Sequence, residues 1–213
     1  MDKIACPLCG REGAIPFYRD RRREYCRCRQ CQLVFVPPSF YLSAVDEKAE
    51  YDLHENTVED SGYRRFLQRA LSPLLPKLRP GMTGLDFGCG PAPALQAMLC
   101  EQGFDVSVYD VFYAPESAAL ARTYDFITAT EVVEHLHDPA SELERLWRQL
   151  RSGGWLLLMT KRVLDVEAFA SWHYKNDPTH VCFFSEATFA WLANRWCATL
   201  EIAGADVVLL GKA

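Results

Sequence analysis

Residues 85–93 read LDFGCGPAP, an apolar strand pattern that runs into a glycine turn and then into a helix. Glycines at positions 88 and 90 let the backbone approach a ligand closely, and the N-terminus of the helix offers unpaired N–H groups. A lone GxG turn is weak evidence, but Asp110 ends the next predicted strand, 22 residues after Gly88. In folds of this type an acid at that place accepts hydrogen bonds from ribose hydroxyls. The sequence therefore predicts a nucleotide-like cofactor at this turn.

From residue 83 onward, short apolar runs alternate with helical patterns, which is typical of an α/β domain whose parallel sheet is covered on both faces. Helices are predicted over residues 138–150, after Ser185 and from Ser61. The predicted strands are residues 83–87, 105–109, 126–130, 155–160, 199–202 and 206–210.

Only 14 residues separate Asp110 from Asp125. A parallel crossover alone takes about a dozen or more residues. We therefore expect a shortened sheet that lacks one strand with its two helices.

The N-terminal segment carries two CxxC motifs, Cys6 with Cys9 and Cys28 with Cys31, separated by 18 residues. Two such knuckles complete a tetrahedral, closed zinc site, and a segment this short needs metal binding as its folding energy. Cys26 is a fifth thiol that could displace a ligand, although the spacing favours Cys28 with Cys31. We predict a zinc-ribbon-like module over residues 1–36, a connector and helix over 37–80, and the α/β domain over 81–213.

Composition and charge indicate which kinds of partner and which compartment to expect. The chain has 213 residues, 49% of them hydrophobic, with no apolar run long enough for a membrane helix. The N-terminus lacks the features of a secretory signal, so we expect a cytoplasmic protein whose nine cysteines are thiols. The first 36 residues carry eight Lys/Arg against four Asp/Glu, and the remainder 15 against 24. Nucleic acid is a weakly supported partner, and the arginine-rich run 19–23 is interpreted as a solvated turn tip.

Residues 85–90 resemble the first motif of the class I S-adenosylmethionine-dependent methyltransferases. Asp110 matches the ribose-binding acid of that family. Residues 124–136 match its fourth strand and the segment after that strand, and residues 150–155 match the turn before its fifth strand. The likeness extends over about residues 83–210 and implies a Rossmann-like domain that binds S-adenosylmethionine.

The resemblance also implies roles for single residues. The backbone at Gly88 and Gly90 would lie near the methionine part of the cofactor, and Asp86 would position its amino group. The chain around Thr130 and Glu131 would line the same pocket. In this family catalysis can be mostly alignment of the acceptor, so no protein nucleophile is expected.

A hydroxyl acceptor would need a base or a metal, for which His135 and His180 are the candidates. Helical spacing would place Glu131, Glu134 and His135 on one face, a donor set suited to magnesium or another divalent cation. The pattern resembles that of small-RNA 2′-O-methyltransferases and polyprenyl-quinone O-methyltransferases, in which a later histidine, here His180, completes the site. Alternatively, Glu134 caps a helix or pairs with an arginine.

Three functions remain open at this point. An N-terminal zinc module joined to such a domain also resembles sugar C-methyltransferases and one ribosomal RNA methyltransferase group. The acidic main domain favours a small-molecule acceptor over RNA recognised through the zinc module. Loss of one strand leaves room for a third function, a non-catalytic protein that senses the cofactor and binds a partner.

Overall fold

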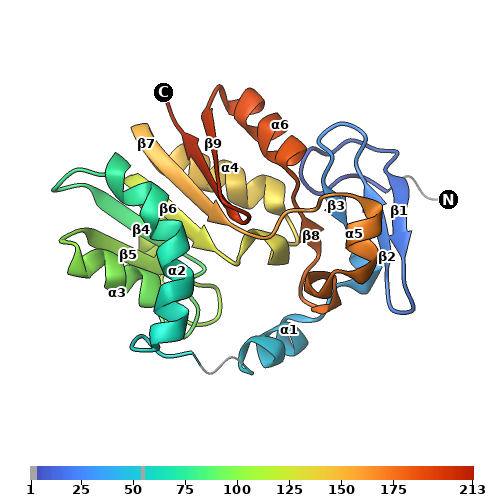
Figure 1. Cartoon of the computed structure of the whole chain (residues 1–213), viewed down its shortest axis with the longest axis horizontal. Helices are drawn as coiled ribbons and strands as arrows, with labels where there is room; N and C mark the ends of the chain where they lie inside the picture. The colour runs from blue at the N-terminus through green and yellow to red at the C-terminus, as the bar shows by residue number, and fades with distance from the viewer. Residues whose placement is uncertain (1–3, 54–55) are drawn as a thin grey trace.

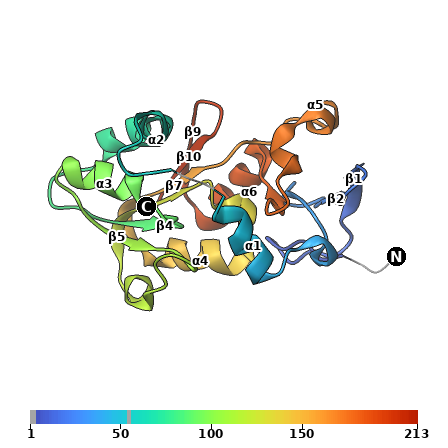
Figure 2. The same cartoon turned by 90° about the horizontal axis from the view of Figure 1, so that it is seen from below.

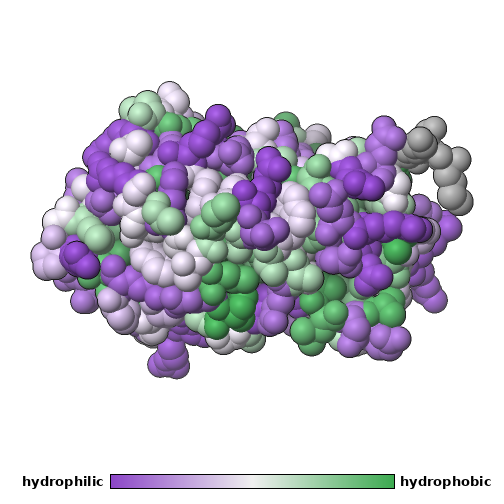
Figure 3. All heavy atoms as spheres, turned by 90° about the horizontal axis from the view of Figure 1, so that it is seen from above, coloured by the Kyte–Doolittle hydropathy of each residue, from purple (hydrophilic) through white to green (hydrophobic). Residues whose placement is uncertain are grey.

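The computed structural model describes residues 4–53 and 56–213 of the chain. It contains a six-stranded sheet flanked by helices and, beside it, a four-stranded sheet that carries the N-terminal segment (Figure 1). Figure 3 shows one face of the molecule covered mostly by hydrophilic side chains, with apolar atoms in separate patches. No helix in the described part of the chain is long and apolar enough to cross a membrane.

The large sheet has the order β5-β4-β6-β7-β10-β9. Its strands are β4 (Thr83–Phe87), β5 (Asp105–Tyr109), β6 (Tyr124–Thr130), β7 (Leu150–Met159), β9 (Thr199–Ala203) and β10 (Val207–Gly211). The first four in this order are parallel, as predicted, whereas β10 is antiparallel to both β7 and β9. The C-terminal pair of strands makes the sheet mixed: β9 and β10 are joined by a turn of three residues, at Gly204 (φ 66°), and so short a connection allows only an antiparallel pair.

The shortened sheet is confirmed. Strand β5 forms one edge, and the only element between β5 and β6 in the described chain is the 3₁₀ turn η3 (Ser117–Ala121). Among the described residues, no further strand therefore pairs with the outer side of β5.

Helices cover both faces of the sheet (Figure 2). The buried residues of α2 (Ser61–Leu74) and α3 (Ala94–Glu101) share one apolar cluster, and those of α4 (Pro139–Gln149) and α6 (Glu186–Trp196) share the other. In α2 the buried positions 67, 70, 71 and 74 follow the period of an amphipathic helix. Side chains cap three of these helices at their N-termini, namely Asp60, Asp138 and Ser185.

The small sheet joins two distant parts of the described chain. Its order is β1 (Ile15–Arg19), β2 (Glu24–Arg27), β3 (Val34–Phe35) and β8 (Cys182–Phe183). Strand β8 pairs with β3 in register Val34 to Phe183, so a segment that precedes α6 completes the sheet of the N-terminal segment.

The connector contains a helix that the sequence pattern does not predict, α1 (Ala44–Tyr51). It begins at Ser43, whose side chain accepts a hydrogen bond from the Asp46 N–H, and it has no buried residue. Hydrophobic period is the main sequence signal for a helix, and α1 lacks one. The remaining elements are η1 (Pro38–Phe40), η2 (Leu75–Lys77), η4 (Val133–His135), α5 (Val166–Ser171) and η5 (His173–Asn176).

Candidate active site and four-cysteine cluster

The glycine turn after β4 has the backbone that its sequence requires. Gly88 and Gly90 have φ angles of 72° and 64°, a region that favours glycine. A Cβ at position 88 would lie 2.4 Å from a methyl carbon of Val132, so no larger residue fits there. The Gly88 N–H donates to the Tyr109 carbonyl at 2.7 Å, which holds the turn against the end of β5.

A cavity of about 720 Å³ opens at this turn. Five of the six predicted cofactor residues line it: Gly88, Gly90, Asp110, Thr130 and Glu131. The sixth, Asp86, is buried within β4 and is not among the lining residues. Its carboxylate accepts a hydrogen bond from the Thr128 hydroxyl at 2.9 Å, and burial raises the pKa of Asp86 to about 7.

Asp110 organises the turn as well as facing the cavity. One carboxylate oxygen accepts from the Gly90 N–H at 3.0 Å, and the other accepts from Phe112 and Tyr113 at 2.8 and 3.1 Å. The carboxylate therefore links the end of β5 to the turn after β4. A carboxylate offers about four acceptor positions, so it retains capacity for a ligand hydroxyl.

On the other side of the cavity the structure brings together Glu134, His135 and His180. Each offers a ligand atom within 4.8 Å of the others, and the two imidazole rings lie 4.6 Å apart. His180 Nδ1 lies 2.7 Å from the Tyr174 carbonyl, which can only accept, so Nδ1 carries a proton. Nε2 lies 3.7 Å from the Asp177 carboxylate and presents a lone pair when the ring is neutral. Burial lowers the pKa of His180, which favours the neutral ring.

Glu131 does not share a helical face with these residues, and that expectation is wrong. Its φ is 54°, its N–H donates to the Met159 carbonyl at 2.8 Å, and the next residues form a 3₁₀ turn. Glu131 is accordingly outside the group formed by Glu134 and the two histidines. Its side chain instead lies 3.4 Å from the Tyr174 hydroxyl, which also hydrogen-bonds Glu134.

The two buried glutamates have unusual electrostatics. Burial raises the pKa of each, and the charge of Glu131 raises that of Glu134 further. Within the described chain, Glu131 Oε1 and Glu134 Oε2 are buried and have no hydrogen-bond partner. A buried carboxylate oxygen of this kind needs a proton, a cation or water to offset its desolvation.

Sequence reasoning missed several residues of this site. Tyr174 lies in η5, a segment without helical or strand period, and Tyr51 lies in the unpredicted helix α1. The Tyr51 ring lies 5.3 Å from the His135 ring, and Tyr51 and Glu47 both line the cavity. The aromatic content of these segments was the only available signal.

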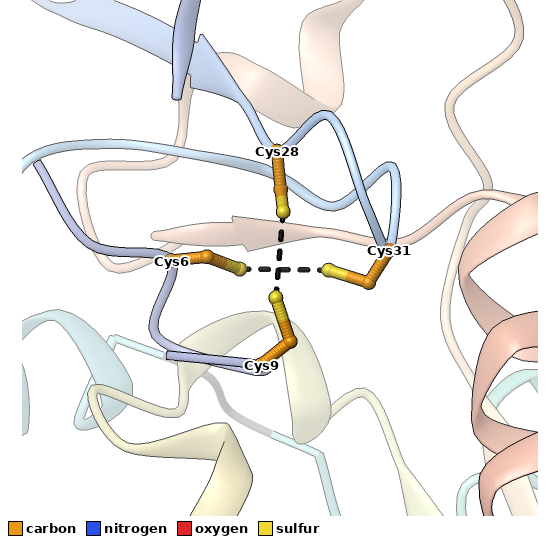
Figure 4. Close-up of side chains that lie close together, drawn as sticks. All are labelled: Cys6, Cys9, Cys28 and Cys31. Atoms are coloured by element: carbon orange, nitrogen blue, oxygen red, sulfur yellow. Dashed lines mark hydrogen bonds between the residues drawn. The ribbon is translucent and has the colours of Figure 1, made fainter. Parts of the chain in front are cut away.

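The four cysteines of the CxxC motifs converge as predicted (Figure 4). The Sγ atoms of Cys6 and Cys31 are 3.5 Å apart, and those of Cys9 and Cys28 are 3.4 Å apart. A tetrahedral zinc site with Zn–S bonds near 2.3 Å separates its sulfurs by ~3.8 Å, so the cluster is consistent with a zinc module. Cys26 is outside the cluster because it lies on β2, paired with Phe35.

Comparison with known proteins identifies the family of the domain that contains the six-stranded sheet. Residues 60–196, more than half of the chain, match a family model described as a methyltransferase domain. A ubiquinone biosynthesis O-methyltransferase of Nitrosomonas europaea is 30% identical over 108 residues, which are 51% of this chain and 45% of that protein. The match thus spans less than half the length of that relative.

Solved structures show the same fold. The magnesium protoporphyrin IX methyltransferase of Synechocystis, with bound S-adenosylmethionine, gives a TM-score of 0.53 at 14% identity, over 82% of this chain and 93% of that one. A methyltransferase of Archaeoglobus fulgidus gives 0.51 at 15% identity, over 65% and 71% of the two chains.

Proposed function

The chain belongs to the methyltransferase domain family and carries an S-adenosylmethionine-dependent methyltransferase domain, and we propose that it methylates a hydroxyl oxygen of a small aromatic acceptor. One observation carries the proposal: a single cavity joins the Gly88 turn to His135 and His180. Aromatic side chains also line it, among them Tyr51 and Phe112, which suits a flat apolar acceptor. The relative from Nitrosomonas europaea is an O-methyltransferase, which supports oxygen as the acceptor atom.

Each side of the cavity would have a separate task. The backbone of Gly88 and Gly90 and the chain at Thr130 would hold the methionine part of the cofactor, and Asp110 would accept from its ribose hydroxyls. Asp86 would position the cofactor's amino group indirectly, because its carboxyl is buried in β4 and does not line the cavity.

S-adenosylmethionine supplies a methyl group on a sulfonium, already activated for transfer. The chain must align the acceptor oxygen and remove its proton. His180 is suited to the second task, since burial lowers the pKa of its ring and Nε2 of the neutral ring can accept a proton. His135 lies beside it and could orient the acceptor or share the proton. A phenolic hydroxyl, with an ordinary pKa of about 10, is far easier to deprotonate than an aliphatic one.

A divalent cation fits the same residues. Glu134, His135 and His180 would hold it, and the Glu134 oxygen that lacks a partner among the described residues would gain one. When bound, such an ion would lower the pKa of an acceptor hydroxyl. Two imidazoles and one carboxylate suit manganese, iron or zinc better than magnesium, which prefers oxygen ligands. Glu131 would join only if its side chain moved.

The test is methyl transfer from labelled S-adenosylmethionine by the full chain. The acceptors are dihydroxybenzoates, with their fully methoxylated counterparts as controls and cellular RNA and protein fractions in parallel. We expect label in the hydroxylated compounds or in the small-metabolite fraction only. Label that enters RNA or protein alone would overturn the proposal.

A further inference from the structure

The segment that carries His180 is bonded to both units of the molecule. We call residues 174–181 the His180 loop. At its end, the Val181 N–H donates to the Glu134 carbonyl at 2.8 Å, and the Val181 carbonyl accepts from the Val36 N–H at 3.0 Å. Val36 directly follows β3, only five residues after Cys31 of the cysteine cluster. The same residue thus joins the acceptor side of the cavity to the N-terminal segment.

Arg23 makes a second connection between the N-terminal segment and the His180 loop. Its guanidinium is buried and donates to four carbonyls of the His180 loop. The distances are 2.8 Å to Asp177, 2.9 Å to His180 and 3.2 Å to Pro178, and the fourth acceptor is Lys175. Four acceptors around one guanidinium fix the path of the loop backbone, because the donors of arginine lie in a rigid plane.

Neighbours of Arg23 on the same hairpin add to this contact. The Tyr25 hydroxyl lies 3.3 Å from the Lys175 carbonyl and 3.1 Å from the Asp20 carboxylate. The Lys175 ammonium in turn lies 3.4 Å from Asp20. Buried charges and hydroxyls of the N-terminal hairpin are thereby satisfied by the His180 loop, which neither unit would achieve alone.

The shape of the loop decides the orientation of His180. The ring is held by a hydrogen bond from its Nδ1 to the carbonyl of Tyr174, the residue next to the first carbonyl that Arg23 binds. A histidine whose Nδ1–H is engaged by a carbonyl presents Nε2 in a fixed direction. If the loop relaxed, the Tyr174 carbonyl and the ring would lose their alignment.

We propose that Arg23 is a positioning residue of the acceptor site, through which the N-terminal four-cysteine module holds the His180 loop so that the His180 ring stays beside Glu134 and His135 with Nδ1 bonded to the Tyr174 carbonyl. The module then supports the active site from behind the His180 loop, without lining the cavity itself. The inference rests on the proposed function in one respect, the assignment of His180 to the acceptor side.

The experiment compares Arg23→Ala with Arg22→Ala, which removes an exposed arginine from the same turn. Hydrogen exchange of the full-length protein should show the amides at residues 180–183 exchanging at least about tenfold faster in Arg23→Ala, and unchanged in Arg22→Ala. Nitrogen NMR of the imidazoles, with His180→Gln for assignment, should show the Nδ1–H form of His180 in the wild type and its loss in Arg23→Ala.

Calorimetry with S-adenosylmethionine separates positioning from general damage. The dissociation constant should stay within about threefold of wild type in Arg23→Ala. Arg23→Lys keeps the positive charge but not the planar set of N–H donors. It should therefore give an intermediate loss of the Nδ1–H form of His180. If Arg23→Ala does not fold, Tyr25→Phe and Arg23→Lys should shift exchange and tautomer in the same direction.

Three results would overturn the proposal. They are an Nε2–H form of His180 in the wild type, wild-type hydrogen exchange and tautomer in the Arg23 and Tyr25 variants, or a loss of S-adenosylmethionine affinity in Arg23→Ala as large as its change in hydrogen exchange. Neither spectroscopic readout contains an acceptor. Failure of methyl transfer to hydroxylated compounds would therefore count against the proposed function, and unchanged exchange and tautomer against the role of Arg23.

Discussion

The two sides of the cavity are built in opposite ways. The cofactor side is local. The turn at Gly88 and the carboxylate of Asp110 follow consecutive strands, and the Gly90 N–H of the turn donates a hydrogen bond to that carboxylate. The acceptor side is assembled from three distant segments, carrying Arg23, Glu134 and His180. Damage to the cofactor side should therefore change cofactor affinity alone, whereas the acceptor side should also respond to changes in the N-terminal module.

The largest effect is expected from Cys28→Ser, which removes a ligand of the four-cysteine cluster. Structural zinc contributes on the order of 10 kcal/mol or more to such modules, so the variant should express poorly, lose bound zinc and show fast exchange over residues 4–36. Wild-type protein should contain about one zinc per chain by metal analysis.

The control is Cys26→Ser, which should keep its zinc because Cys26 lies outside the cluster. Where Cys28→Ser protein can be purified, its dissociation constant for S-adenosylmethionine should stay within about threefold of the wild-type value, or ~0.6 kcal/mol. A larger loss would mean that the two sides of the cavity are not separable.

His180→Gln should lower kcat for a hydroxylated aromatic acceptor by about 10²–10⁴-fold, the usual contribution of a general base. Cofactor affinity should not change, since the ring faces the acceptor side. His173→Gln, a change at a less buried histidine of the same segment, is the matched control. Equal kcat in the two variants would remove His180 from the mechanism.

Asp110→Ala should weaken S-adenosylmethionine binding by roughly tenfold to a hundredfold, because hydrogen bonds to a charged acceptor contribute about 1.5–3 kcal/mol. Calorimetry measures the change, with the exposed Asp105→Ala of the same strand as control. The loop carrying His180 should keep wild-type hydrogen exchange. An unchanged dissociation constant would place the ribose elsewhere.

The smallest effect concerns pH and Asp86. Its pKa of about 7 in the folded state lies above the ordinary value of 3.8, because the carboxyl is buried. From about pH 4 to 7 the unfolded chain loses this proton while the folded chain keeps it, so the free energy of unfolding should fall as pH rises.

Asp86→Asn should reduce that fall by at least about 1 kcal/mol between pH 5 and pH 8 in chemical denaturation. Both proteins carry the cysteine cluster, so loss of metal at low pH affects them equally. Identical slopes in the two proteins would show that Asp86 is ionised throughout.

The same contrast explains how much of the molecule is predictable from sequence. Strands 83–87 and 105–109 are predicted at their observed bounds, because apolar runs and glycine turns are local signals. The helical face proposed for Glu131 fails because its left-handed backbone breaks the period just after β6. The arginine run is interpreted from sequence as a solvated turn; Arg21 and Arg22 are exposed, but Arg23 is buried against carbonyls more than 150 residues away. Contacts of that range leave no local pattern.

The most direct test is a crystal structure of the full chain with the demethylated cofactor product, S-adenosylhomocysteine. We expect its ribose at Asp110, its amino acid part at the Gly88 turn and its sulfur directed toward the space between His135 and His180. A product bound outside this cavity, or with its sulfur directed away from the two histidines, would contradict the account.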